Sequence, residues 1–127
     1  MAIILDTNAL SAFADGQPAL RQAIEAENDL VLPVVVLGEY LFGIRQSRHR
    51  ARYEHWLHSH LAGFVVLEIG RETASSYAEL RAELKSQGQP IPTNDLWIAA
   101  LARQHDCRLA TRDRHFESVR GLRLVIW

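Results

Sequence analysis

The sequence contains a single cysteine and no apolar run that approaches the roughly 20 residues needed to cross a bilayer. Cys107 alone cannot form an intramolecular disulfide, which is typical of a protein kept in a reducing compartment. The first carboxylate, Asp6, comes too early for the apolar segment of a signal peptide. We therefore expect a cytoplasmic protein with no membrane contact.

An excess of positive charge is also absent. The chain has 14 lysines and arginines against 15 aspartates and glutamates, for a formal net charge of -1. This balance gives no general attraction to nucleic acid, so a polyanionic substrate would have to be held by local basic side chains or by a metal ion. The length of 127 residues and the hydrophobic content of 48% predict a single globular domain over residues 1–127.

Short apolar segments alternate with helical patterns along the chain. We expect strands at residues 2–5, 30–32, 64–69, 108–111 and 122–126. Helices are expected at residues 9–14, 20–27, 33–44, 48–62, 71–86 and 96–104, with residues 93–95 as the cap of the last one. This alternation predicts a three-layer α/β/α sandwich with a central parallel sheet of about five strands.

Four carboxylates stand out against this framework. In parallel sheets, polar residues with chemical roles gather at the carboxyl ends of the strands. Asp6 directly follows the first strand and Asp113 follows the strand that ends at Thr111, so both should lie on the same edge. Glu39 and Asp95 are the only charged residues in segments 30–44 and 86–102, which are otherwise apolar or uncharged.

Each of these acids also has a simpler interpretation. Asp6 and Asp95 stand where helix caps are expected, and Asp113 could be an ordinary turn residue. Glu39 lies on a helix apolar enough to be buried around most of its circumference, where an unpaired carboxylate costs several kcal/mol. A distant arginine or a bound cation would compensate that cost, and a Glu39 side chain that reaches an exposed edge would avoid it. If the fold brings all four acids together, their mutual repulsion favours a hard divalent cation such as Mg²⁺ or Mn²⁺.

Four segments of the sequence resemble the PIN domain, and most closely its VapC-type toxins from bacterial toxin–antitoxin pairs. They are residues 3–8, residues 36–43 around Glu39, residues 94–100 after Pro92-Thr93, and residues 109–116 around Asp113. The segments occur in the family's order and with similar separations, and the resemblance covers nearly the whole chain. It implies a metal-dependent endoribonuclease that hydrolyses RNA phosphodiester bonds.

The resemblance also assigns roles to individual residues. It implies that the catalytic, metal-holding set consists of Asp6, Glu39, Asp95 and Asp113. It implies supporting roles, through the orientation of waters or carboxylates, for Thr7, Asn8, Asn94 and Thr111. Similar toxins form homodimers and are silenced by a VapB-type antitoxin, so we expect both partners here in addition to RNA.

Basic and imidazole side chains are the remaining candidates. Arg112, Arg114 and His115 flank Asp113, where they could contact RNA phosphates near the metal. The basic run at residues 45–52 is more typical of a solvated helix start. The three histidines at residues 55, 58 and 60 lack the spacing of a zinc site and indicate an exposed helix surface. An inert PIN-like adaptor that only binds RNA or protein is the alternative function.

Overall fold

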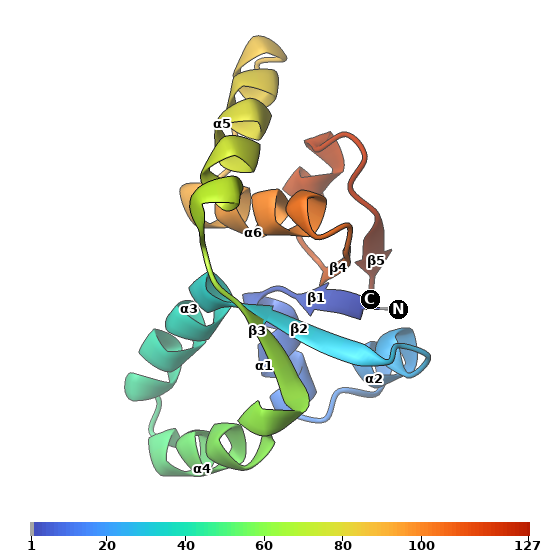
Figure 1. Cartoon of the computed structure of the whole chain (residues 1–127). Helices are drawn as coiled ribbons and strands as arrows, with labels where there is room; N and C mark the ends of the chain where they lie inside the picture. The colour runs from blue at the N-terminus through green and yellow to red at the C-terminus, as the bar shows by residue number, and fades with distance from the viewer. Residues whose placement is uncertain (1) are drawn as a thin grey trace.

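The computed structural model describes residues 2–127, which form a five-stranded sheet with every pair of neighbouring strands parallel (Figure 1). The strands are β1 (Ala2–Leu5), β2 (Asp29–Pro33), β3 (Phe64–Leu67), β4 (Arg108–Thr111) and β5 (Leu124–Ile126). Their order across the sheet is β3-β2-β1-β4-β5. The predicted parallel sheet is confirmed.

Helices cover both faces of this sheet. They are α1 (Thr7–Ala14), α2 (Pro18–Ile24), α3 (Val34–Arg45), α4 (Arg50–His60), α5 (Arg71–Ser86) and α6 (Thr93–Gln104). Two short 3₁₀ segments, η1 (Leu61–Gly63) and η2 (Arg114–Ser118), complete the elements. Figure 1 shows α1 to α4 on one side of the sheet and α5 and α6 on the other, which confirms the three-layer arrangement.

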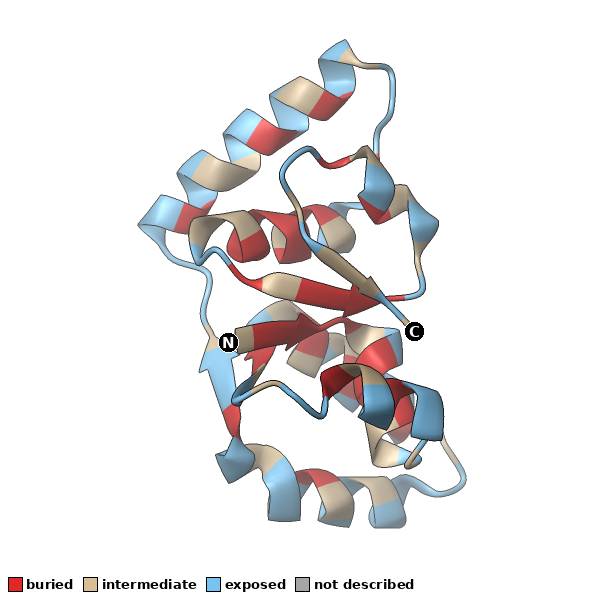
Figure 2. Ribbon diagram, turned by 90° about the vertical axis from the view of Figure 1, so that its right-hand side faces the viewer, coloured by how far each residue is buried: buried red, intermediate tan, exposed pale blue. Residues whose placement is uncertain are grey.

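The two central strands form the middle of the core. Ile3, Ile4 and Leu5 of β1 and Leu109 and Ala110 of β4 have no exposed surface. Such continuous apolar runs are expected where helices cover a parallel sheet from both sides. Figure 2 shows the buried residues concentrated in these strands and in the helix faces that pack on them. The centre of the sheet is therefore the rigid support for anything attached to its edge.

The order in which strands are added to the sheet changes sides between β1 and β4, although all strands stay parallel. The chain runs outward from β1 through β2 to β3, then returns through α5 and α6 to place β4 on the other side of β1. Helix α1 leaves β1 on one face of the sheet, whereas α6 leads into β4 from the other face. In open α/β sheets, this switch point is where a crevice forms beyond the carboxyl ends of the strands.

Two expectations about the helices are wrong in detail. Helix α3 is not buried around most of its circumference, since Leu41 and Phe42 are 41% and 65% exposed. Only part of the apolar surface of α3 therefore packs in the core. Residues 93–95 are not a cap but the first turn of α6, and the preceding Pro92 occupies the N-cap position. The fixed φ of Pro92 and its lack of an N–H suit a helix start. Within residues 2–127, no helix combines the length and the hydrophobicity that a membrane span requires.

We expect Leu109→Ala to lower the free energy of unfolding by about 2–5 kcal/mol, because the fully buried side chain leaves a cavity in the central strand. Urea unfolding followed by circular dichroism measures this loss. Ile69→Ala, just after the edge strand β3, is the matched control, since Ile69 is 39% exposed and the substitution should cost less than about 1 kcal/mol. Equal losses for the two variants would contradict the difference in burial between the two side chains.

Candidate metal centre

The carboxyl edge of the sheet receives acids from four separate elements. Asp6 lies between β1 and α1, and Asp113 lies between β4 and η2. Glu39 comes from the second turn of α3 and Asp95 from the first turn of α6. The side chains are close enough for direct electrostatic interaction, which links Asp6 to Asp95 and Asp113, and Asp95 to Asp113 and Glu39. The four acids therefore interact electrostatically at one edge of the sheet, and of these acids only Asp95 and Asp113 are in a group whose ligand atoms lie within 4.8 Å of one another among residues 2–127.

Asp6 is the most buried member of this group, with only 3% of its surface exposed. Its Oδ1 accepts a hydrogen bond of 2.8 Å from the Ala9 N–H, so Asp6 does cap α1, as one interpretation of the sequence expected. Burial nevertheless raises the pKa of the Asp6 carboxyl, and the charges of Asp113 and Asp95 raise it further. Hydrogen bonds from Ala9 and Thr111 compensate this effect only in part.

Thr111 connects the two strand ends that carry acids. Its side chain is fully buried, and its hydroxyl oxygen accepts a hydrogen bond of 2.9 Å from the Asp113 N–H. The hydroxyl also hydrogen-bonds to the carboxylate of Asp6, where it must act as the donor because an ionised carboxylate can only accept. One side chain therefore fixes the backbone at Asp113 and the carboxylate at Asp6 together.

Thr7, the first residue of α1, holds Glu39 of α3 in a similar way. The Thr7 hydroxyl donates a hydrogen bond of 2.8 Å to Oε1 of Glu39. Within residues 2–127, neither lysine nor arginine forms an ion pair with Glu39, so the alternative of a distant arginine partner is wrong. Glu39 is half-buried and interacts electrostatically with Asp95.

Asp95 contacts His115, which the sequence suggested as a phosphate contact and not as a partner of the acids. Oδ2 of Asp95 lies 2.6 Å from Nε2 of His115, and Oδ2 of Asp113 lies 3.9 Å from the same nitrogen. Burial raises the pKa of Asp95, as do the charges of Asp113 and Glu39, whereas His115 opposes the shift. The only sequence signal for His115 was its place two residues after Asp113 in the predicted turn.

The donor set fits a divalent cation. The carboxylate oxygens of Asp95 and Asp113 and an imidazole nitrogen of His115 all lie within 4.8 Å of one another. The buried Asp6 carboxylate adds negative charge beside them, and no lysine or arginine among residues 2–127 forms an ion pair with it. Carboxylate oxygens suit Mg²⁺ and Mn²⁺, and an imidazole nitrogen is also compatible with Mn²⁺.

The other predicted residues lie around this centre. Asn94 is exposed and lines a shallow pocket with Thr7 and Glu39, whereas Asn8 is exposed next to Thr7. The guanidinium of Arg112 lies 3.8 Å from the ring centroid of Trp127, so this side chain packs on the C-terminal residue. Arg114 is 81% exposed. Contact of either arginine with RNA stays a prediction.

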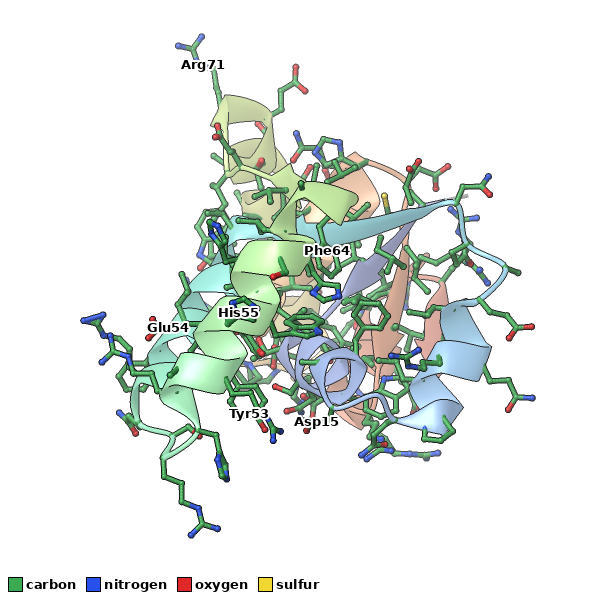
Figure 3. The ribbon with its side chains drawn as sticks, turned by 90° about the horizontal axis from the view of Figure 1, so that it is seen from below. Asp15, Tyr53, Glu54, His55, Phe64 and Arg71 are labelled. Carbon is green, nitrogen blue, oxygen red and sulfur yellow. The ribbon has the colours of Figure 1, made fainter. Side chains whose placement is uncertain are left out.

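The three histidines of α4 lie away from the acidic edge. All three are exposed, and His60 stacks on Trp56 with ring centroids 4.6 Å apart. Figure 3 shows His55 on the same helix as Tyr53, whose hydroxyl donates a 3.1 Å hydrogen bond to Asp15 at the end of α1. The expected exposed helix surface is confirmed for these three histidines.

Comparison with known proteins identifies the sequence relationship. A model of the PIN-domain family matches residues 3–122. VapC ribonuclease Y4jK of Sinorhizobium fredii is 32% identical, and the match covers 97% of this chain and 95% of the relative. The tRNA(fMet)-specific endonuclease VapC of Shigella flexneri is 28% identical over 100% of this chain and 98% of its own.

Solved structures give the same result for the fold. The crystal structure of VapBC2 from Rickettsia felis, bound to a DNA fragment from its promoter, matches with a TM-score of 0.88 and 25% identity. The match covers 100% of this chain and 99% of the solved chain. The FitAcB structure from Neisseria gonorrhoeae matches with a TM-score of 0.82 and 26% identity, over 96% of this chain and 95% of the other.

We expect Asp6→Asn to stabilise the metal-free protein at pH 7. Because the folded state raises the pKa of Asp6 above the value of 3.8 for a free aspartate, folding binds protons in the window above pH 3.8. The free energy of unfolding therefore falls as the pH rises through that window, and it stays reduced at neutral pH. Asparagine removes the charge and still accepts the hydrogen bond from Ala9.

Thermal unfolding in EDTA between pH 3 and 7 measures this effect. The advantage of Asp6→Asn should be largest at neutral pH and disappear in acid, where the parent carboxyl is protonated. Asp29→Asn, at an exposed carboxylate, is the control and should show no such advantage. An Asp6→Asn variant that is less stable than the parent at pH 7 would show that the ionised carboxylate is fully compensated within the fold.

Proposed function

Because the chain belongs to the PIN-domain family, we propose that it is a metal-dependent endoribonuclease and the toxin component of a toxin–antitoxin pair. One observation carries the proposal beyond family membership. Four acids from four elements meet at the switch-point edge of the sheet, and the most buried of them, Asp6, has a raised pKa. Carboxylates that repel one another in this way favour the binding of a cation, because its positive charge offsets the repulsion.

The chain's own residues prepare this site for hydrolysis of a phosphodiester bond. Asp6, Glu39, Asp95 and Asp113 would hold Mg²⁺ or Mn²⁺, with the hydroxyls of Thr7 and Thr111 orienting Glu39 and Asp6. When bound, such an ion activates water and stabilises the negative charge of the transition state. Asn94 and Asn8 are available for water or RNA contacts at the rim, and Arg114 for a phosphate.

A protein partner is supported by the surface of α3 and α4. Between these helices lies a groove of about 600 Å³ whose lining includes Leu41, Ile44, Leu57 and Leu61 together with the charged Arg45 and Glu54. Glu54 is seen along α4 in Figure 3. VapBC complexes are among the matched structures, so we assign this groove to a VapB-type antitoxin segment.

A second copy of the chain and RNA complete the proposed partners. Val34 and Phe42 of α3 and Val65 and Val66 of β3 are apolar and exposed, which is the kind of surface that homodimers cover. We also propose a cytoplasmic location, where an RNA-cleaving toxin meets its substrate. An inert adaptor would need neither a metal nor the acids for RNA binding, which makes the two functions separable by experiment.

We expect the purified protein to cleave RNA in Mn²⁺ or Mg²⁺ and to lose this activity in EDTA. Asp95→Asn should reduce the rate by at least about 100-fold, because removing one ligand of a shared ion affects the whole site. Cleavage of total RNA followed on denaturing gels measures both effects. Glu72→Gln, an exposed acid on α5, is the matched control and should cleave like the parent. RNA binding without cleavage, unchanged by EDTA, would favour the adaptor.

We expect Glu39→Gln to lower cleavage by about 10- to 100-fold while the melting temperature of the metal-free protein changes by no more than about 2 °C. The amide can still accept the hydrogen bond from Thr7, so the fold keeps that contact. The same assay and a thermal melt in EDTA measure the two quantities, with the exposed Glu68→Gln as control. A large drop in melting temperature would instead give Glu39 a structural role.

A further inference from the structure

His115 is held at the acidic edge by the residue that follows it. Phe116 is fully buried and anchors η2 in the core. The imidazole of His115 lies next to that ring, with centroids 5.1 Å apart, and remains about one-third exposed. The turn that carries Asp113 is fixed as well, since the Thr111 hydroxyl accepts the Asp113 N–H. The position of the imidazole is therefore set by the fold and not by a flexible loop.

One ring nitrogen faces both neighbouring carboxylates. Nε2 of His115 is 2.6 Å from Oδ2 of Asp95 and 3.9 Å from Oδ2 of Asp113. An ion with bond lengths of about 2.1 Å holds ligands in adjacent octahedral positions about 3 Å apart. The two distances bracket this value, so small side-chain rotations would place the three atoms around one ion.

We infer that His115 is a direct metal ligand, through Nε2, and that it makes the site select Mn²⁺ over Mg²⁺. This inference rests on the proposed metal-dependent function and adds a nitrogen donor to its ligands. Mg²⁺ strongly prefers oxygen donors, whereas imidazole binds transition metals such as Mn²⁺ more readily. The competing role is positional, in which the ring only holds Asp95 by a hydrogen bond while the ion binds carboxylates alone.

His115→Gln separates the two roles. The glutamine amide nitrogen takes the place of Nε2 and can still donate a hydrogen bond to Asp95, but it is a poor metal ligand. His105→Asn, at an exposed histidine at the C-terminal end of α6, is the matched control. Electron spin echo spectroscopy of Mn²⁺ bound to the tag-free protein detects nitrogen-14 coupled to the metal without any need for cleavage. Calorimetric titration gives the Mn²⁺ and Mg²⁺ affinities of the same samples.

We expect nitrogen-14 modulation in the parent and in His105→Asn, and its loss in His115→Gln. The affinity for Mn²⁺ should fall by about 10-fold or more in His115→Gln, with a smaller change for Mg²⁺. Bound Mn²⁺ without nitrogen coupling in the parent, or coupling that persists in His115→Gln, would overturn the assignment of His115 and leave the metal-dependent function intact. Failure of the parent to bind Mn²⁺ at millimolar concentration would overturn both.

Discussion

The arrangement of this protein depends on carboxylates that are kept close together in a partly dehydrated place. Asp6 is almost completely buried, and Asp95 and Asp113 lie near it, so each ionised group raises the free energy of the others. A fold selected for stability alone would place arginines there, as it does at the ion pair of Arg103 with Glu83 between α6 and α5. The repulsion between these carboxylates is tolerable if a bound cation supplies positive charge in place of arginine.

The parallel sheet is what makes such a concentration of charge tolerable. Strands β1 and β4 are packed on both faces by apolar side chains, so the polypeptide ends at the switch point are rigid. Two threonine hydroxyls then connect the acids to this frame, Thr111 from the sheet itself and Thr7 from α1. Stability comes from the core, and the edge can remain electrostatically unfavourable without unfolding the protein.

Much of this was predictable from the sequence, and the part that was not has a physical reason. The strand ends at Asp6 and Asp113 follow from short apolar runs, and Glu39 and Asp95 are conspicuous as lone charges on uncharged segments. The role of His115 depends on how η2 turns back over α6, a tertiary contact that leaves no periodic pattern. The exposure of Phe42 was missed for a similar reason, since an apolar helix can face the core or a partner with the same residues.

The contact between Arg112 and Trp127 has a practical consequence. The indole lies against a guanidinium whose own residue immediately precedes Asp113, and Arg112 also donates a hydrogen bond of 3.4 Å to the Trp127 carbonyl oxygen. A charged group in contact with an indole changes the fluorescence of that indole, so a displacement of this turn would change the fluorescence of Trp127. Trp127, one of three tryptophans in the sequence, is thus the one whose fluorescence would respond to a movement of Arg112 beside Asp113.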